Sequence, residues 1–87
     1  MEFPRILTVN PLTGYKLKIL FDNNTIKIYD CGPLLKEFPA FRILLDYSLF
    51  KTVRADIGGY GVVWSDDLDL AESELWINGV PETLSID

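Results

Sequence analysis

The sequence of 87 residues contains no histidine and only one cysteine, Cys31. Without histidine, the chain cannot form a serine–histidine–aspartate triad, a cysteine–histidine pair or a zinc site based on imidazole. A single cysteine excludes an internal disulfide and fits a reducing compartment. Because the commonest acid–base group at neutral pH is missing, the composition favours a protein that is not an enzyme.

Long apolar runs are also absent. No window approaches the roughly 18 consecutive apolar residues of a membrane span, and the N-terminus lacks a basic region followed by an apolar signal core. A hydrophobic content of 48% with eleven aromatic residues excludes an intrinsically disordered chain. We therefore expect one soluble, cytoplasmic α+β domain over residues 1–87, with a modest core.

Basic residues are missing from the C-terminal third of the chain. All eight lysines and arginines lie at or before Arg54, together with five acids, whereas residues 55–87 contain eight acids and no basic residue. A surface with one sign of charge steers encounters with oppositely charged partners and repels others. This asymmetry predicts a basic partner for the C-terminal segment.

The N-terminal part of the chain has the pattern of extended structure. Residues 4–12 favour a strand, and the period-two pattern that follows predicts a hairpin over residues 15–30. We expect its inward side chains to be Tyr15, Leu17, Ile19 and Phe21 on the first strand, and Ile26 and Ile28 on the second.

The turn of this hairpin determines which side chains face one another. Asparagine tolerates the positive φ of tight turns, so the turn is expected at Asn23-Asn24. A loop of these two residues places Lys18 opposite Tyr29 and Leu20 opposite Lys27.

Residues 31–50 change to short helical segments. Pro33 suits the first turn of a short helix, and Pro39 ends or kinks it. Asp46 fits an N-cap for a further helical turn that carries Leu49 and Phe50. These helices are expected to cover one face of the antiparallel sheet.

A second hairpin is predicted between residues 53–57 and 62–64, across the glycine-rich turn at 58–61. That turn is not a phosphate loop, because it leads into a strand and no lysine follows. Asp69 and Glu72 match a capping box and predict a helix that Asn78-Gly79 ends. The alternative makes Asn78-Gly79 a hairpin turn.

Clustered acids and two tryptophans form the candidate docking surface. The acids could attract a basic partner, bind a divalent cation, or simply solvate the start of a helix. Tryptophans often dominate interface energy, although core packing is the favoured role of Trp64. The sequence implies no cofactor and no defined metal ligands. The predicted partner-binding residues are Trp64, Asp66, Asp67, Asp69, Glu72, Glu74 and Trp76.

A basic and aromatic combination on the first hairpin gives an alternative, nucleic-acid-binding site. With the two-residue loop, its members share the outer face of the sheet. Three lysines neutralise few phosphates, and lysines that solvate a sheet and discourage edge pairing explain the same residues. The members are Lys16, Lys18, Lys27 and Tyr29.

Several short motifs follow one another along the chain: Phe21-Asp22-Asn23, Tyr29-Asp30-Cys31-Gly32-Pro33-Leu34-Leu35, Leu49-Phe50-Lys51-Thr52-Val53-Arg54, Gly58-Gly59, Val63-Trp64, Asp69-Leu70 and Leu75-Trp76. Their order resembles the small bacterial family catalogued as domain of unknown function 2442. The resemblance implies a compact α+β domain with an antiparallel sheet and short helices, and no established activity or functional residues. Members look like accessory proteins, some with an attached helix-turn-helix segment, and many are encoded beside another small protein, as toxin–antitoxin pairs are.

Charge, missing catalytic groups and the resemblance together predict a non-catalytic accessory or regulatory protein with an antitoxin-like role. Its acidic C-terminal surface would bind a basic protein. The alternatives are a small metal- or ligand-binding domain, an enzyme that uses carboxylates, and a weak nucleic-acid binder. A homodimer through a free sheet edge is compatible with each of these functions.

Overall fold

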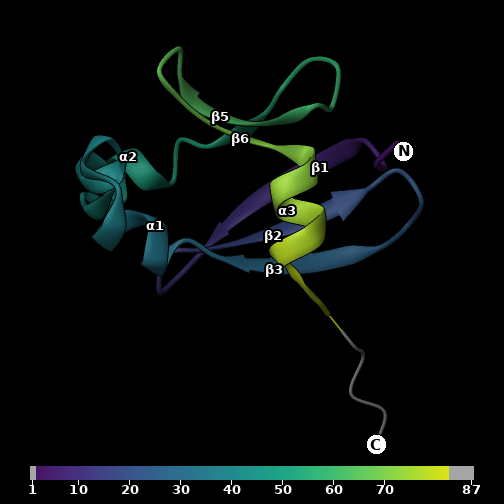
Figure 1. The fold of residues 1–87 in the computed structure, drawn as a ribbon, viewed down its shortest axis with the longest axis horizontal. Helices are drawn as coiled ribbons and strands as arrows, with labels where there is room; N and C mark the ends of the chain where they lie inside the picture. Colours follow the sequence, from purple (N-terminus) through teal and green to yellow (C-terminus); the bar gives the residue numbers. More distant parts are fainter. Residues whose placement is uncertain (1, 83–87) are drawn as a thin grey trace, which may run out of the picture.

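The computed structural model describes residues 2–82, which form two antiparallel sheets and a group of short helices (Figure 1). The α+β class is confirmed, with the strands divided between two sheets. The first sheet has the order β1 (Ile6–Leu12), β2 (Lys16–Phe21), β3 (Ile26–Asp30), β7 (Val80–Pro81). The second consists of β4 (Arg54–Ala55), β5 (Gly61–Ser65) and β6 (Leu68–Ala71). The helices are α1 (Gly32–Glu37), the 3₁₀ helix η1 (Pro39–Leu45), α2 (Tyr47–Phe50) and α3 (Glu72–Asn78).

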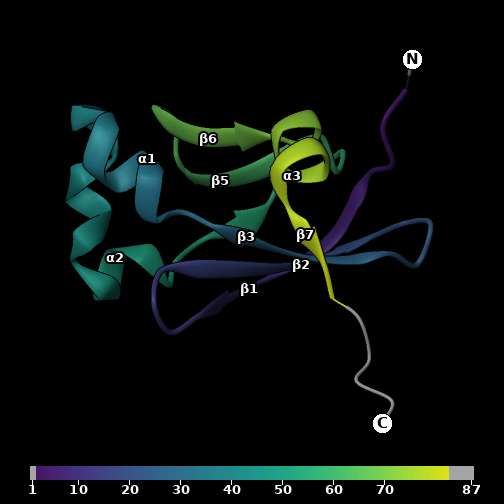
Figure 2. The same cartoon turned by 60° about the horizontal axis from the view of Figure 1, so that its bottom comes forward.

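The second sheet and α3 lie over one face of the first sheet, while α1 and α2 gather at one end (Figure 2). The core lies between these layers. It combines inward residues of β2, such as Ile19 and Phe21, with Val62 of β5 and Leu75 of α3, all of which are fully buried. Burial of this apolar surface is the main stabilising contribution to a domain of this size.

The β2–β3 hairpin is confirmed, but its register differs from the prediction. Leu17 lies opposite Tyr29 and Ile19 lies opposite Lys27, so the inward residues of β3 are Tyr29 and Lys27. The prediction that Ile26 and Ile28 face inward is wrong. Their partners across the ladder are Leu20 and Lys18, on the outer face.

The length of the loop explains this difference. Phe21 accepts a hydrogen bond from the Asn24 amide at 3.0 Å and donates one to the Thr25 carbonyl at 2.9 Å. The loop therefore contains three residues, the last of which, Asn24, has φ +69°. This arrangement is a common three-residue hairpin loop. One additional loop residue shifts the register by one position and moves every side chain of β3 to the other face.

The short helices follow their predicted signals. Pro33 lies in the first turn of α1, and Pro39 begins η1. The Asp46 side chain caps α2 by accepting a hydrogen bond from the Ser48 amide at 3.0 Å. Proline fits these positions because the first turn of a helix does not need its amide hydrogen.

The predicted hairpin over the glycine turn is confirmed as β4–β5, but the predicted capping box is wrong. Asp69 lies in β6 opposite Val63, and Ala71 is the N-cap residue of α3, without a side-chain hydrogen bond. Strand β6 buries Leu68 and Leu70, and each buried leucine contributes about 1.5–3 kcal/mol. An N-cap contributes only about 1 kcal/mol, so pairing with β5 outweighs the local signal.

The end of α3 agrees with the helix prediction rather than with the hairpin alternative. The helix extends to Asn78, and the Gly79 amide donates to the Leu75 carbonyl at 3.0 Å. The chain then pairs with β3 through Val80 and Pro81. This short strand β7 brings the C-terminal end of α3 to the edge of the first sheet.

Candidate functional site

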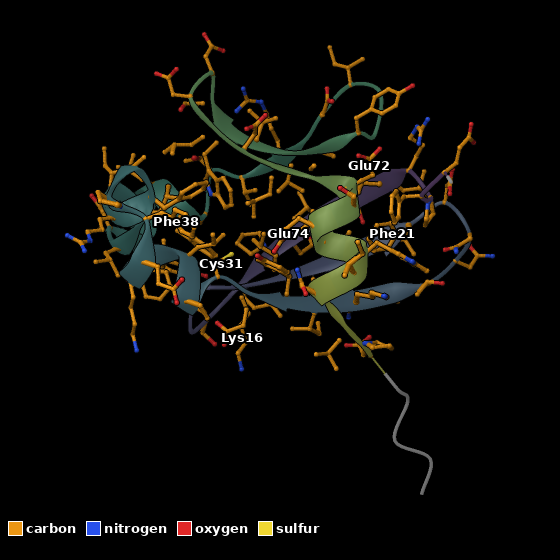
Figure 3. All side chains as sticks on the ribbon, in the orientation of Figure 1. Lys16, Phe21, Cys31, Phe38, Glu72 and Glu74 are labelled. Atoms are coloured by element: carbon orange, nitrogen blue, oxygen red, sulfur yellow. The ribbon has the colours of Figure 1, made fainter. Side chains whose placement is uncertain are left out.

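A cleft of about 620 Å³ lies beside the edge of β3, between α1, α3 and β7. We call it the β3 cleft. Figure 3 shows Glu74 projecting from α3 towards the α1 end of the molecule, and Lys16 at that end of the sheet. A volume of this size is within the usual range of ligand sites. Its walls are formed by Lys16, Ile28, Tyr29, Asp30, Pro33, Glu74, Asn78 and Val80.

The strand register leaves part of the β3 edge uncovered at this cleft. Strand β7 pairs with Lys27 and Ile28 only. On the other side of β3, the Cys31 amide donates to the Tyr15 carbonyl of the β2 side at 2.9 Å. Because the direction of backbone groups alternates along an antiparallel strand, those of Asp30 point away from β2. Within residues 2–82, no strand pairs with Asp30 on that side.

Tyr29 and Glu74 join β3 to α3 at one wall of the cleft. The Tyr29 hydroxyl donates a hydrogen bond to Glu74 Oε2 at 2.8 Å. Burial of the Tyr29 ring, with this hydrogen bond and the nearby negative charge, raises the pKa of Tyr29 above its usual value. The tyrosine therefore stays protonated at neutral pH, and it fixes the position of the carboxylate.

The cleft contains two carboxylates and one ammonium group, from Asp30, Glu74 and Lys16. Asp30 Oδ1 accepts a hydrogen bond from the Gly32 amide at 2.8 Å. Among the described residues, neither carboxylate forms a salt bridge; the acids that do are Glu72 and Glu82. Asp30 and Glu74 therefore retain capacity to accept hydrogen bonds from a cationic group.

The predicted acidic surface is divided between two parts of the fold. Asp66 and Asp67 lie in the turn between β5 and β6, and Asp69 is exposed on β6. Glu72 and Glu74 lie on α3, where Glu72 forms a 3.5 Å salt bridge with Arg5. Over residues 2–82, no group of acidic or cysteine side chains is arranged to hold a metal ion.

Neither predicted tryptophan anchor presents a free ring. Trp64 is 7% exposed and donates from Nε1 to the Phe50 carbonyl at 2.9 Å, which places it in the core. Trp76 is half-buried, and its ring packs edge-on against Phe21 at a centroid distance of 5.0 Å. These contacts give both side chains a structural role.

The predicted basic face of the hairpin is wrong. The register places Lys16 and Lys18 on the outer face of the first sheet, but Lys27 and Tyr29 on the inner face. Lys18 also forms a 3.5 Å salt bridge with Glu82. The four residues of the alternative nucleic-acid site therefore do not share one surface.

Cys31 lies in the core at the start of α1, with only 1% of its surface exposed. Burial, with a smaller effect from the charge of Asp30, raises the pKa of the Cys31 thiol to about 12. A thiol that remains protonated at neutral pH is a poor nucleophile. Cys31 therefore has a structural role in the core.

Sequence reasoning placed Lys16, Tyr29 and Glu74 in two separate candidate sites, whereas the structure brings them to one cleft. The sequence patterns do not predict the other two polar residues of the cleft, Asp30 and Asn78. For Asp30, the signal is its position two residues before Gly32, where an aspartate side chain commonly accepts a backbone hydrogen bond. Nothing local marks Asn78, because its proximity to β3 depends on the path of α3.

None of the helices in the described part of the chain has the length and apolar character needed to span a bilayer.

The model of the protein family described as "Protein of unknown function (DUF2442)" matches residues 6–80. No curated protein matches the sequence. The fold is similar to the crystal structure of the "Putative DNA Binding Protein" NE0471 from Nitrosomonas europaea ATCC 19718, with a TM-score of 0.76 and 25% sequence identity. The alignment covers 87% of this chain and 48% of the other, so this chain spans about half the length of that protein.

Proposed function

This chain belongs to the DUF2442 family of proteins of unknown function, and we propose that it is a non-catalytic accessory protein that binds a basic protein partner at the β3 cleft. The observation that supports this proposal is the pair of carboxylates, Asp30 and Glu74, that line the cleft without a salt bridge to any described residue. Lysine and arginine side chains complement such a surface through charge-assisted hydrogen bonds.

The remaining acids support the same partner at longer range. Asp66, Asp67 and Asp69 are exposed on the β5–β6 hairpin and make no salt bridge with a described residue. Charges outside the contact surface mainly raise the rate of association, whereas paired charges within it determine affinity. We therefore assign long-range attraction of the partner to Asp66, Asp67 and Asp69, which we call the hairpin acids, and direct contact with the partner to the β3 cleft.

The biological role that fits this binding mode is regulatory and antitoxin-like. A protein that covers a basic surface on its partner prevents that surface from contacting other anionic molecules. The domain needs no catalytic group for this role. The proposal therefore accommodates a chain without histidine and with a buried cysteine.

Affinity purification from the native host lysate at low and moderate salt tests the proposal. The baits are the wild type, the cleft variant Asp30→Asn/Glu74→Gln and the hairpin variant Asp66→Asn/Asp67→Asn. We expect a stoichiometric basic protein with the wild type, and at least about tenfold weaker binding by the cleft variant, since a charged hydrogen bond contributes roughly 1.5–3 kcal/mol. Calorimetry with the purified partner provides the affinities.

The hairpin variant is the matched control, because it removes the same number of charges outside the cleft. We expect it to slow association and to lose less affinity than the cleft variant. A partner that binds the cleft variant with wild-type affinity would contradict the proposal, as would the absence of a basic partner at either salt concentration. Loss of binding only in the hairpin variant would also contradict the proposal, because it would show that the interface lies at the β5–β6 turn.

A second candidate function follows from the structural similarity to a protein described as DNA binding. In this case Lys16 and Lys18, on the outer face of the first sheet, would contact DNA phosphates. A separate element would recognise the base sequence. Gel-shift titration of a short DNA duplex at two salt concentrations tests this function. If this function is correct, the affinity for DNA decreases in the variant Lys16→Ala/Lys18→Ala and also decreases at the higher salt concentration.

A further inference from the structure

We infer that the β3 cleft takes an extended segment of the partner, hydrogen-bonded to the backbone of Asp30 and carrying a lysine or arginine side chain directed at Glu74. The inference rests on the proposed function, because it specifies the form and chemistry of what that cleft binds. Three features of the site support it: an open strand edge, the alternation of side chains along an added strand, and a carboxylate held in position.

The open edge is the first feature. Strand β7 already pairs with β3, but it begins at Val80 opposite Ile28, so none of its residues lies opposite Asp30. Beyond that point, the outward amide and carbonyl of Asp30 are the next pair available for hydrogen bonding along the same edge. Pro33 of α1 also lines the cleft. A short extended segment between Val80 and Pro33 therefore continues the line of β7, by the same strand addition that many peptide-binding domains use.

The alternation of side chains predicts a pattern in the bound segment. In the bound segment, the residue opposite Asp30 points to the outer face of the sheet, where the side chains of Lys16 and Ile28 lie. Its two neighbours point to the inner face, towards Tyr29 and Glu74. The segment therefore places a basic residue on the inner side, next to an apolar or acidic residue on the outer side.

The position of Glu74 is fixed before a ligand arrives. Its Oε2 atom accepts the hydrogen bond from Tyr29, and Tyr29 itself is 5% exposed. An acceptor that does not need to be ordered on binding gives more of its interaction energy to the complex. A half-buried carboxylate is also less screened by salt than the exposed acids of the β5–β6 turn.

Selection from a displayed library of random heptapeptides tests the inference on the intact chain. The targets are the wild type, Glu74→Gln and the control Asp66→Asn. Glutamine keeps an oxygen that accepts the Tyr29 hydrogen bond, removes the negative charge and replaces the other carboxylate oxygen with an amide donor. We expect lysine or arginine to be enriched in peptides selected by the wild type and by Asp66→Asn, and this enrichment to be lost with Glu74→Gln.

A synthetic peptide from the wild-type selection provides the quantitative test. Its affinity is expected to fall about tenfold with Glu74→Gln, the size of one charged hydrogen bond. N-methylation of the peptide residue opposite Asp30 is expected to weaken binding similarly, because it removes a backbone donor. Titration of the protein with this peptide should shift the NMR resonance of the Asp30 amide, because that amide lies at the proposed contact. The urea midpoint of each variant separates a loss of binding from a loss of folding.

Several results would overturn the inference. These are no enriched peptide, enrichment without basic residues, enrichment that Glu74→Gln leaves unchanged, or an Asp30 amide that does not respond to the peptide. If a basic partner depends on Asp30 and Glu74 but no peptide does, the inference fails and the proposed function stands. If peptides bind as expected but no basic protein partner exists, the proposed function fails while the peptide site remains.

Discussion

The ammonium group of Lys27 lies 3.9 Å from the centroid of the Trp76 ring and donates a hydrogen bond to the Trp76 carbonyl. Lys27 belongs to the inner face of β3, and Trp76 to α3, so the contact joins the sheet to the helix. It involves the two groups, the Lys27 ammonium and the Trp76 ring, for which the sequence predicts a binding role. The cation stabilises the packing of α3, and the Trp76 ring also packs against Phe21.

The substitution Lys27→Met is expected to destabilise the protein by about 1 kcal/mol. Methionine keeps most of the apolar part of the lysine side chain, but it removes the cation above the Trp76 ring and the hydrogen bond to the Trp76 carbonyl. Cation–π contacts contribute roughly 0.5–2 kcal/mol to stability. Urea unfolding monitored by tryptophan fluorescence measures the change. Lys16→Met is the matched control, because Lys16 is exposed; its effect should stay within about 0.5 kcal/mol. Equal effects at both positions would refute the structural role of Lys27.

The register of the first hairpin depends on Asn24, whose φ is +69°. We expect Asn24→Gly to change stability by less than about 0.5 kcal/mol, and Asn24→Val to reduce it by about 1–2 kcal/mol, because a β-branched side chain is strained at positive φ. Urea unfolding of the two variants provides the comparison. NMR contacts between Ile19 and Lys27 report the register directly. If valine is tolerated as well as glycine, the three-residue loop is not what sets the pairing.

The Cys31 thiol is expected to react slowly with a disulfide reagent at pH 8 in the folded protein and rapidly in urea. Its folded pKa is about 12, against an ordinary value of 9.0. Above pH 9 the unfolded chain loses the thiol proton while the folded chain keeps it, so this group lowers stability progressively between pH 9 and 12. Urea midpoints of the wild type and Cys31→Ala across this range isolate the effect. Parallel pH profiles, or fast reaction of the folded thiol, would show that Cys31 is more accessible than its 1% exposure indicates.

Several local features of the fold could be predicted from the sequence because their causes act over a few residues. The β2–β3 hairpin follows from period-two hydrophobicity, and α1 and α2 follow from Pro33 and the Asp46 cap. The start of α3 was predicted wrongly for the opposite reason. The capping pattern at Asp69 is local, but burial of Leu68 and Leu70 against other parts of the fold contributes more.

Three properties can be read from the sequence alone: the strands and helical turns of the N-terminal half, the absence of histidine chemistry, and the acidic character of the C-terminal third. These depend on residue type and short spacing. The way the elements pack in three dimensions brings Asp30 and Glu74 to one cleft and leaves the acids of the β5–β6 hairpin elsewhere. One additional loop residue, Asp22, moved the side chains of β3 to the opposite face, and the pairing of β7 brought the end of α3 to the edge of β3. The choice of loop length depends on which side chains of β3 the rest of the fold buries, and the β7 pairing depends on the path of α3; short-range patterns contain neither.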